Sequence, residues 1–318
     1  MVARLRCPTT LVGSGVWLIL SGCPQLLTDD FQNGIHETSQ MDSKLDASAW
    51  SSDPVPTSEL DAGLGNTAGS DAGSASTDAS QVTLTSTELA LVPNLRAALA
   101  HRYDFDGIGI TAVDTVAGAD GYIYNDSLVD QGFIRLGANN QYVSLPDGLI
   151  SSGPDRTLEA WLIWRGGDAW QRIFDFGSSD KGELQQGVGR SYLYLTAKAD
   201  TGKLLVGFSL NGTTNEVRLR GTQSLTVDQL THVAVVVDGG SSAMSLYVDG
   251  ALDSTVPLTQ PLSGIVDNNL WIGHSQFVAD PGLNADVLEF RIYNQALTPD
   301  ELAVSAKLGA DDPLTSTP

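Results

Sequence analysis

One of the two cysteines of the chain lies in the surroundings that a processed and modified thiol requires. Cys23 follows Leu-Ser-Gly at 20–22, and an apolar run fills 11–20. Arg4 and Arg6 give this start a positive charge. The run has the length of a signal-peptide core, roughly 7–15 residues, and is too short to cross a bilayer. The pattern predicts a signal peptide that is cut immediately before Cys23.

These residues together resemble the lipobox of bacterial lipoproteins, in which a diacylglycerol is attached to the cysteine thiol and the new N-terminus is acylated. The resemblance implies that residues 1–22 are removed and that Cys23 is the lipid attachment site. The protein would then be lipid-anchored in the bacterial cell envelope. Pro24 stands where an Asp often retains lipoproteins in the inner membrane, which favours the outer membrane. The alternatives are an ordinary secretory signal with an incidental cysteine, or a cytosolic start.

The other candidate nucleophiles and bases show no catalytic arrangement in the sequence. Cys7 lies inside the predicted signal, so a modified Cys23 leaves the mature chain without a thiol and excludes disulfides, cysteine nucleophiles and thiolate metal sites. No G-x-S-x-G motif occurs. His274 and Ser275 are adjacent, and neighbours on a strand face opposite sides. His232 begins a predicted strand, and we interpret it as a hydrogen-bonded core residue.

Glycoside hydrolysis needs two carboxylates that face each other, about 5–10 Å apart. The strand pattern around Glu159 has one acid, while Asp286 and Glu289 are three positions apart. On a regular strand this spacing points two side chains to opposite faces. We therefore expect no catalytic residues and a protein that is not an enzyme. A carbohydrate-active enzyme of the glycoside hydrolase kind is the alternative.

The charge balance limits the classes of partner. With a formal net charge of −21, the chain lacks the basic surface that a nucleic-acid binder needs. Attraction to anionic headgroups is disfavoured for the same reason, so the predicted lipid would be the contact with the membrane. Many exposed carboxylates suit hard cations, calcium above all.

Two regions of contrasting composition follow the predicted signal. Between residues 23 and 86, Ser, Thr, Asp, Ala and Gly dominate, with ten acidic residues and one lysine. Such a stretch buries too little apolar area to offset its ordering entropy, so we predict a disordered acidic linker over 23–86. From 87 to 309, short segments alternate apolar and polar residues between turn signals, which predicts one β domain. Residues 310–318 are expected to form a flexible tail.

Strands dominate the predicted domain. They are expected at 133–136, 142–145, 157–164, 172–176, 191–197, 203–210, 216–220, 232–237, 244–248, 270–273 and 287–293. This many short strands indicate two packed antiparallel sheets, a sandwich or jelly roll. Thr298, Pro299 and Glu301 form the capping pattern of a short C-terminal helix, and 90–99 is a second candidate helix at the entrance of the domain.

Eight motifs follow one another in a specific order. They are YDFDG at 103–107, YV at 142–143, TLEAW at 157–161, QRIFDFG at 171–177, HVA at 232–234, LYVDG at 246–250, WIG at 271–273 and EFRIYNQAL at 289–297. The series resembles the laminin-G-like, pentraxin-related branch of the concanavalin A-like jelly rolls. This resemblance implies a two-sheet antiparallel jelly roll. It also implies a binding module for glycans, proteins or lipids, often with calcium at one sheet edge.

The same resemblance implies a candidate calcium site. Asp114 lies in a turn where family members often have a metal-facing acid. Asp286 and Glu289 are candidate partners, because the last strand lies near the first in this topology. Two departures weaken the match: Leu288 replaces the first of a usual acidic pair, and Ala285 replaces a usual glycine. The alternative is that the three acids cap turns and face water.

Aromatic residues supply a candidate ligand platform. Trp161 and Trp164 are three positions apart on one predicted strand, so they point to opposite faces. Trp161 belongs to a motif, and we assign it to the core and Trp164 to the other face. Trp164 and Trp170 flank a Gly-Gly loop at 166–167 and are candidate ligand-binding residues. The alternative is that both belong to the core.

The expected protein is a membrane-anchored lipoprotein. It displays a non-catalytic laminin-G-like module that binds a glycan or another surface macromolecule. Besides the enzyme already mentioned, a structural surface protein without a small ligand is an alternative.

Overall fold

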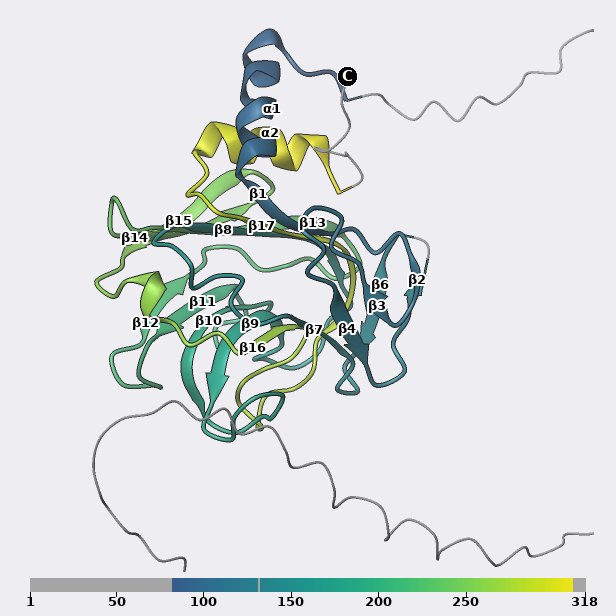
Figure 1. Ribbon diagram of the computed structural model, residues 1–318, viewed down its shortest axis with the longest axis vertical. Helices are drawn as coiled ribbons and strands as arrows, with labels where there is room; N and C mark the ends of the chain where they lie inside the picture. The colour runs from purple at the N-terminus through teal and green to yellow at the C-terminus, as the bar shows by residue number, and fades with distance from the viewer. Residues whose placement is uncertain (1–81, 131, 311–318) are drawn as a thin grey trace, which may run out of the picture. The chain divides into compact units, whose positions relative to one another are not determined.

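The structure is a computed structural model that describes residues 82–130 and 132–310 (Figure 1). The predicted signal peptide, Cys23, most of the predicted linker and the tail from 311 onward lie outside the described residues. Within the described ranges, no helix is long and apolar enough to span a bilayer.

The described residues form two antiparallel sheets, which confirms the predicted β sandwich. In spatial order the nine-stranded sheet consists of β15 (Ala251–Pro257), β14 (Ala243–Val248), β13 (Leu230–Asp238), β8 (Arg156–Trp164), β17 (Asn284–Tyr293), β6 (Ile134–Gly137), β5 (Val129–Asp130) and β2 (Ile108–Gly109), with β1 (Leu99–Tyr103) also paired to β17. The eight-stranded sheet consists of β12 (Val217–Arg220), β11 (Leu205–Ser209), β10 (Gly189–Thr196), β9 (Arg172–Ser179), β16 (Asn269–Ile272), β7 (Tyr142–Leu145), β4 (Gly121–Tyr124) and β3 (Thr111–Ala112). Each sheet therefore joins strands that are distant in the sequence.

The main core lies between the two sheets, where alternate residues of both point inward. Three of its rings, Phe174, Phe176 and Phe290, lie with centroids 5.2–5.8 Å apart and are at most 1% exposed. Burying such a side chain stabilises the fold by roughly 1.5–3 kcal/mol. The alternation that the sequence shows along these strands is therefore the alternation between core and outer face.

Two helices pack together and cover the outer face of the nine-stranded sheet (Figure 1). Helix α1 (Ser86–Ala98) and helix α2 (Pro299–Leu308) each begin with a capping box, in which a threonine and a glutamate satisfy backbone groups. Lys307 of α2 also contacts Glu88 of α1 at 2.9 Å. The C-terminal helix is thus confirmed, and the candidate helix at 90–99 is present but begins earlier, at Ser86. A short 3₁₀ helix, η1 (Leu262–Gly264), precedes β16.

Candidate functional site

A β-bulge in β17 changes where its acidic residues point. Val287 pairs with Leu162 and Glu289 with Trp161, so Leu288 is an extra residue in the ladder. Asp286 and Glu289 consequently both lie outside the core, although they are three positions apart. The prediction that they face opposite sides is wrong, because it assumed a regular strand.

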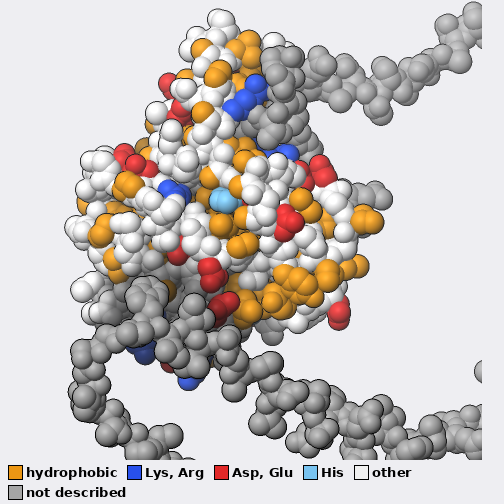
Figure 2. Space-filling view, in the orientation of Figure 1, with side chains coloured by type: hydrophobic (Ala, Val, Ile, Leu, Met, Phe, Trp, Pro, Cys, Tyr) orange, Lys and Arg blue, Asp and Glu red, His pale blue; other side chains and the backbone are white. Residues whose placement is uncertain are grey.

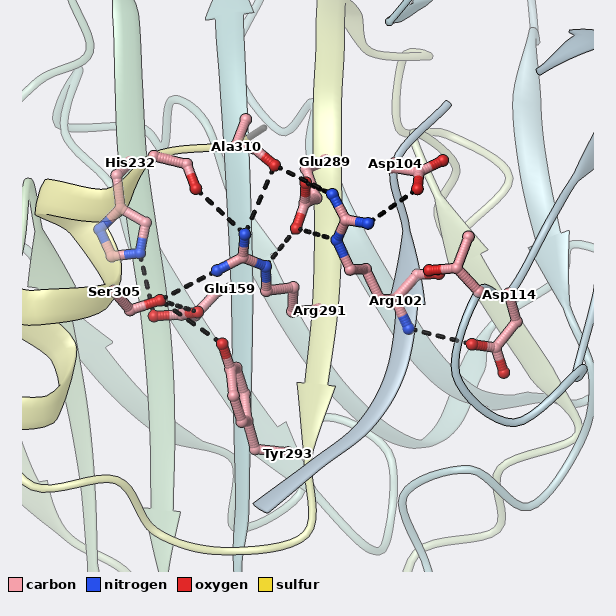
Figure 3. Close-up of polar contacts among 12 residues, drawn as sticks. Arg102, Asp104, Asp114, Glu159, His232, Glu289, Arg291, Tyr293, Ser305 and Ala310 are labelled. Carbon is pink, nitrogen blue, oxygen red and sulfur yellow. Dashed lines mark hydrogen bonds and ion pairs between the residues drawn. The ribbon is translucent and has the colours of Figure 1, made fainter. Parts of the chain in front are cut away.

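Glu289 belongs to a buried polar network between the nine-stranded sheet and α2 (Figure 3). Arg102 donates two hydrogen bonds to the Glu289 carboxylate, both at 2.9 Å. Arg291 contacts the same carboxylate, and its guanidinium lies 4.3 Å from the centre of the Trp161 ring. Glu159 accepts hydrogen bonds from Ser305 of α2 at 2.8 Å and pairs with His232 at 3.2 Å. The network joins four strands of the sheet, β1, β8, β13 and β17, to the helix.

The two glutamates of this network differ in their pKa. Burial alone would raise the pKa of Glu159, but the His232 hydrogen bond and the nearby charge of Arg291 lower it below its usual value. For Glu289 burial outweighs the two arginines and raises the pKa. Both carboxylates are at most 1% exposed and already paired. They act as structural anions that arginines neutralise.

The three acids predicted to share a calcium site do not come together. Across the described part of the chain, no group of three or more His, Asp and Glu side chains is arranged to hold a metal ion. Asp114 accepts hydrogen bonds from His101 at 2.8 Å and from backbone N–H groups of its own turn. Asp286 is held by Arg135 and Arg165. Calcium takes six to eight oxygen ligands, which these separated and occupied carboxylates do not offer.

The predicted tryptophan platform is not an exposed pair. Trp164 is 7% exposed and packs in the main core, where its Nε1 donates to Gln171 at 3.0 Å. Trp161 lies on the opposite face, where it is 2% exposed and packs against Arg291 and His232, so the two faces are the reverse of those predicted. Trp170 is half-buried beside the aromatic residues of β10. The motif position of Trp161 reflects packing against Arg291 and His232 on the outer face of the sheet rather than membership of the main core.

A different aromatic group lies on the outer face of the eight-stranded sheet. The rings of Tyr124 and Tyr142 are stacked at 4.7 Å and 7°, and those of Tyr142 and His274 at 4.2 Å and 9°. Tyr122 meets Tyr124 edge-on at 4.7 Å and is 48% exposed. We call these four residues the aromatic surface. Burial lowers the pKa of His274 to about 4, so at neutral pH this surface carries no charge of its own.

The aromatic surface lies on β4, β7 and the loop after β16. Figure 2 shows hydrophobic side chains gathered in a band on the side of the domain where Figure 1 places β4 and β7. Sequence reasoning missed the surface although a signal existed: Tyr122 and Tyr124 alternate around the core residue Ile123 on one short strand. Stacking across β4 and β7 depends on their register, in which Tyr124 pairs with Tyr142. That register is not visible in the sequence.

Farther along the same outer face, the loop after β16 covers a buried acid. Asp175 is 0% exposed and accepts hydrogen bonds from the backbone of Gln276 at 3.0 Å and from Ser275 at 3.3 Å. Arg172 lies 3.5 Å from Asp175 and 2.7 Å from Asp280 of the loop. Burial raises the pKa of Asp175 to about 7. The loop thus covers Asp175 with Ser275 and Gln276, while its His274 belongs to the aromatic surface.

The two curved antiparallel sheets, with helices on one face and aromatic rings on the other, define a jelly roll of the lectin type. A family model of the concanavalin A-like lectin/glucanases superfamily matches residues 137–303. The chain belongs to this superfamily, and the resemblance seen in its motifs is confirmed. A comparison with curated proteins finds no match.

Several solved structures share the fold at low identity. A Trypanosoma rangeli sialidase is 16% identical with a TM-score of 0.52, over 67% of this chain and 33% of the sialidase chain. The ligand-binding domain of botulinum neurotoxin serotype D, in complex with N-acetylneuraminic acid, is 11% identical with a TM-score of 0.52, over 68% and 52%. Domain 4 of a GH43 arabinanase from Geobacillus stearothermophilus, with arabinotriose, is 19% identical with a TM-score of 0.49, over 64% and 96%. At 16% and 11% identity, the likeness to the sialidase and to the neurotoxin domain shows the fold alone.

Proposed function

We propose that this domain is a non-catalytic glycan-binding module and that the glycan rests on the aromatic surface. The stacked rings of Tyr124, Tyr142 and His274, with Tyr122 at the exposed end, carry this proposal. A tyrosine side chain combines an apolar face with a hydroxyl, which suits a partner whose rings have apolar faces and polar edges. Tyr122 is 48% exposed and Tyr124 half-buried, so these two rings reach solvent, while the buried rings of Tyr142 and His274 support them from below. Exposed aromatic side chains can mark interaction sites.

The position of the acids supports binding without hydrolysis. Glu159 and Glu289 are buried under α2 and paired with His232 or arginine, and Asp175 is buried under the loop after β16. A glycosidase acid has to reach the glycosidic oxygen of its substrate, and these three do not reach solvent. The glycan-binding neighbours support the proposal through the shared fold.

Replacing Tyr124 by Ala is expected to weaken glycan binding roughly five- to tenfold, because loss of one stacking ring costs on the order of 1–1.5 kcal/mol. The ligand would first be found with a glycan array, using residues 82–318. Affinities of the wild type and of Tyr124→Ala would then be compared by calorimetry.

Leu128→Ala is the matched control, since Leu128 is 54% exposed but lies beside the nine-stranded sheet. It should bind as the wild type does. Equal affinity of Tyr124→Ala and wild type would rule out the aromatic surface as the site. Release of shortened glycan products would instead indicate the enzyme.

We also propose that the module is displayed on a bacterial membrane through a lipid on Cys23. The support is the sequence from Arg4 to Cys23, with its positive start, short apolar run and Leu-Ser-Gly-Cys site. Cys23→Ser should move the protein from the detergent-soluble membrane fraction to the soluble fraction. Cys7→Ser is the control and should leave the protein with the membranes. Membrane partitioning of Cys23→Ser like that of the wild type would refute the anchor.

A further inference from the structure

A pocket of about 470 Å³ opens between α2 and the outer face of the nine-stranded sheet. Its volume lies within the range of roughly 300–1,000 Å³ that small-molecule sites occupy. The sheet supplies Trp161 and His232, and the turn between β14 and β15 supplies Asp249. Ala303 and Ala306 of α2 form the opposite wall. We call this cavity the helix pocket; it lies on the opposite sheet from the aromatic surface.

The helix pocket contains a buried polar atom without a partner. His232 is 4% exposed, and its Nε2 lies 3.2 Å from Oε1 of Glu159. Its Nδ1 is buried and has no hydrogen-bond partner. Figure 3 shows the second ring nitrogen on the side away from Glu159, toward α2. A buried polar atom that is left unpaired costs about 1–3 kcal/mol, so an atom of this kind at the wall of a cavity points to a ligand.

The carboxylate of Glu159 determines what this nitrogen can bind. An ionised carboxylate only accepts hydrogen bonds, and the pKa of Glu159 is held below its usual value. Nε2 of His232 therefore carries the proton that is donated to Glu159. In the neutral ring Nδ1 accepts a hydrogen bond and in the protonated ring it donates one, and a ligand hydroxyl group can be the partner of either form.

Two charged side chains line the pocket, and one of them is already in an ion pair. Asp249 accepts a hydrogen bond from the backbone N–H of His232 at 3.0 Å, and Lys307 pairs with Glu88 at 2.9 Å. The rest of the wall is apolar, with Ala303, Ala306 and the indole of Trp161. An anionic ligand would lose its hydration and meet the carboxylate of Asp249, since Lys307 is already paired with Glu88. These walls favour an uncharged ligand.

We propose that the helix pocket is a second binding site, which takes a neutral polyol such as a monosaccharide ring and receives one of its hydroxyl groups at Nδ1 of His232. A polyol offers the required hydroxyl group and adds no charge. The site is independent of the proposed glycan binding on the aromatic surface.

The test uses the domain, residues 82–318, with glycerol, glucose and N-acetylglucosamine as probes. Long-range ¹H–¹⁵N NMR spectra of the histidine rings report which nitrogen is protonated and which accepts a hydrogen bond. We expect at least one probe to shift the Nδ1 resonance of His232 saturably while Nε2 stays protonated. Each probe is added to about 0.1 M, which is 100 times a millimolar dissociation constant. The proposal is overturned if no probe shifts the Nδ1 resonance of His232 at that concentration.

Ala303→Leu tests the pocket without altering the dyad of His232 and Glu159. The larger side chain occupies the cavity, and we expect it to weaken probe binding at least about tenfold. Ala97→Leu, at an exposed alanine of α1 that does not line the pocket, is the matched control and should bind like the wild type. Unchanged binding by Ala303→Leu would overturn the proposal. Tyr124→Ala should keep the His232 response, which separates this site from the aromatic surface.

Discussion

Replacing Arg291 by Met is expected to lower the free energy of unfolding by about 3–5 kcal/mol. Arg291 is 0% exposed, contacts Glu289, and pairs across the sheet with Glu159. Met keeps much of the volume beneath α2 but removes the positive charge. Glu159 would still pair with His232, and Glu289 with Arg102. Both carboxylates would remain buried, but with one positive charge fewer beside them. The loss therefore comes from anions left without charge balance rather than from a cavity.

Urea unfolding at pH 7 would measure this loss. A triple variant, Arg291→Met with Glu159→Gln and Glu289→Gln, should recover a large part of it, because no buried carboxylate then remains next to the missing arginine. Arg220→Met is the control: Arg220 pairs with Asp200 on the surface, and such a pair contributes about 0–1 kcal/mol. An Arg291→Met loss as small as that of Arg220→Met would contradict the structural role of the network.

Asp175→Asn is expected to stabilise the protein relative to the wild type as the pH rises. The pKa of Asp175 is raised by burial from 3.8 to about 7. The folded state thus holds a proton that the unfolded state has already released, so the contribution of Asp175 to stability is present below pH 4. It is lost as the pH rises toward 7. Since a pKa difference of one corresponds to about 1.4 kcal/mol, the rise from 3.8 to about 7 corresponds to about 4 kcal/mol.

The measurement is urea unfolding of both proteins at pH 5 and at pH 8. Between these values the stability of Asp175→Asn relative to the wild type should increase by about 2–3 kcal/mol. Asp286→Asn gives the opposite sign, because Arg135 and Arg165 overcome the effect of burial and lower the pKa of Asp286. The wild type should lose its advantage over that variant only as the pH falls below about 4. A pH-independent difference for Asp175→Asn would show that this acid is ionised in the folded state.

Local patterns in the sequence were sufficient to predict the strands of the two sheets and the start of helix α2. Alternation along segments such as 157–164 predicted strands correctly, and Thr298 with Glu301 predicted the start of α2, because both signals depend on neighbours in the chain. The faces of single side chains were harder to predict. The extra residue Leu288 moves Glu289 to the face of Asp286, and it is recognised only from the pairing with β8.

The candidate sites could not be predicted from local patterns, because they depend on contacts between residues that are far apart in the sequence. The pairing of Asp114 with His101 and of Asp286 with Arg135 and Arg165 joins residues that are distant in the sequence or on different strands. A count of acidic residues cannot reveal that their oxygens are already occupied. Trp161 packs against His232 and Arg291, which follow it by more than seventy residues in the sequence.

The position of α1 has a mechanical consequence. In a chain that is held from its N-terminal side while its domain grips a target, tension reaches the 13 residues of α1 before it reaches any strand. The next segment, β1, is hydrogen-bonded to β17 inside the larger sheet and resists more strongly. Unwinding α1 would lengthen the tether by about 25 Å, the difference between helical and extended rise. Helix α1 would therefore unfold first under tension, and its unfolding would limit the force that reaches the sheets and the aromatic surface.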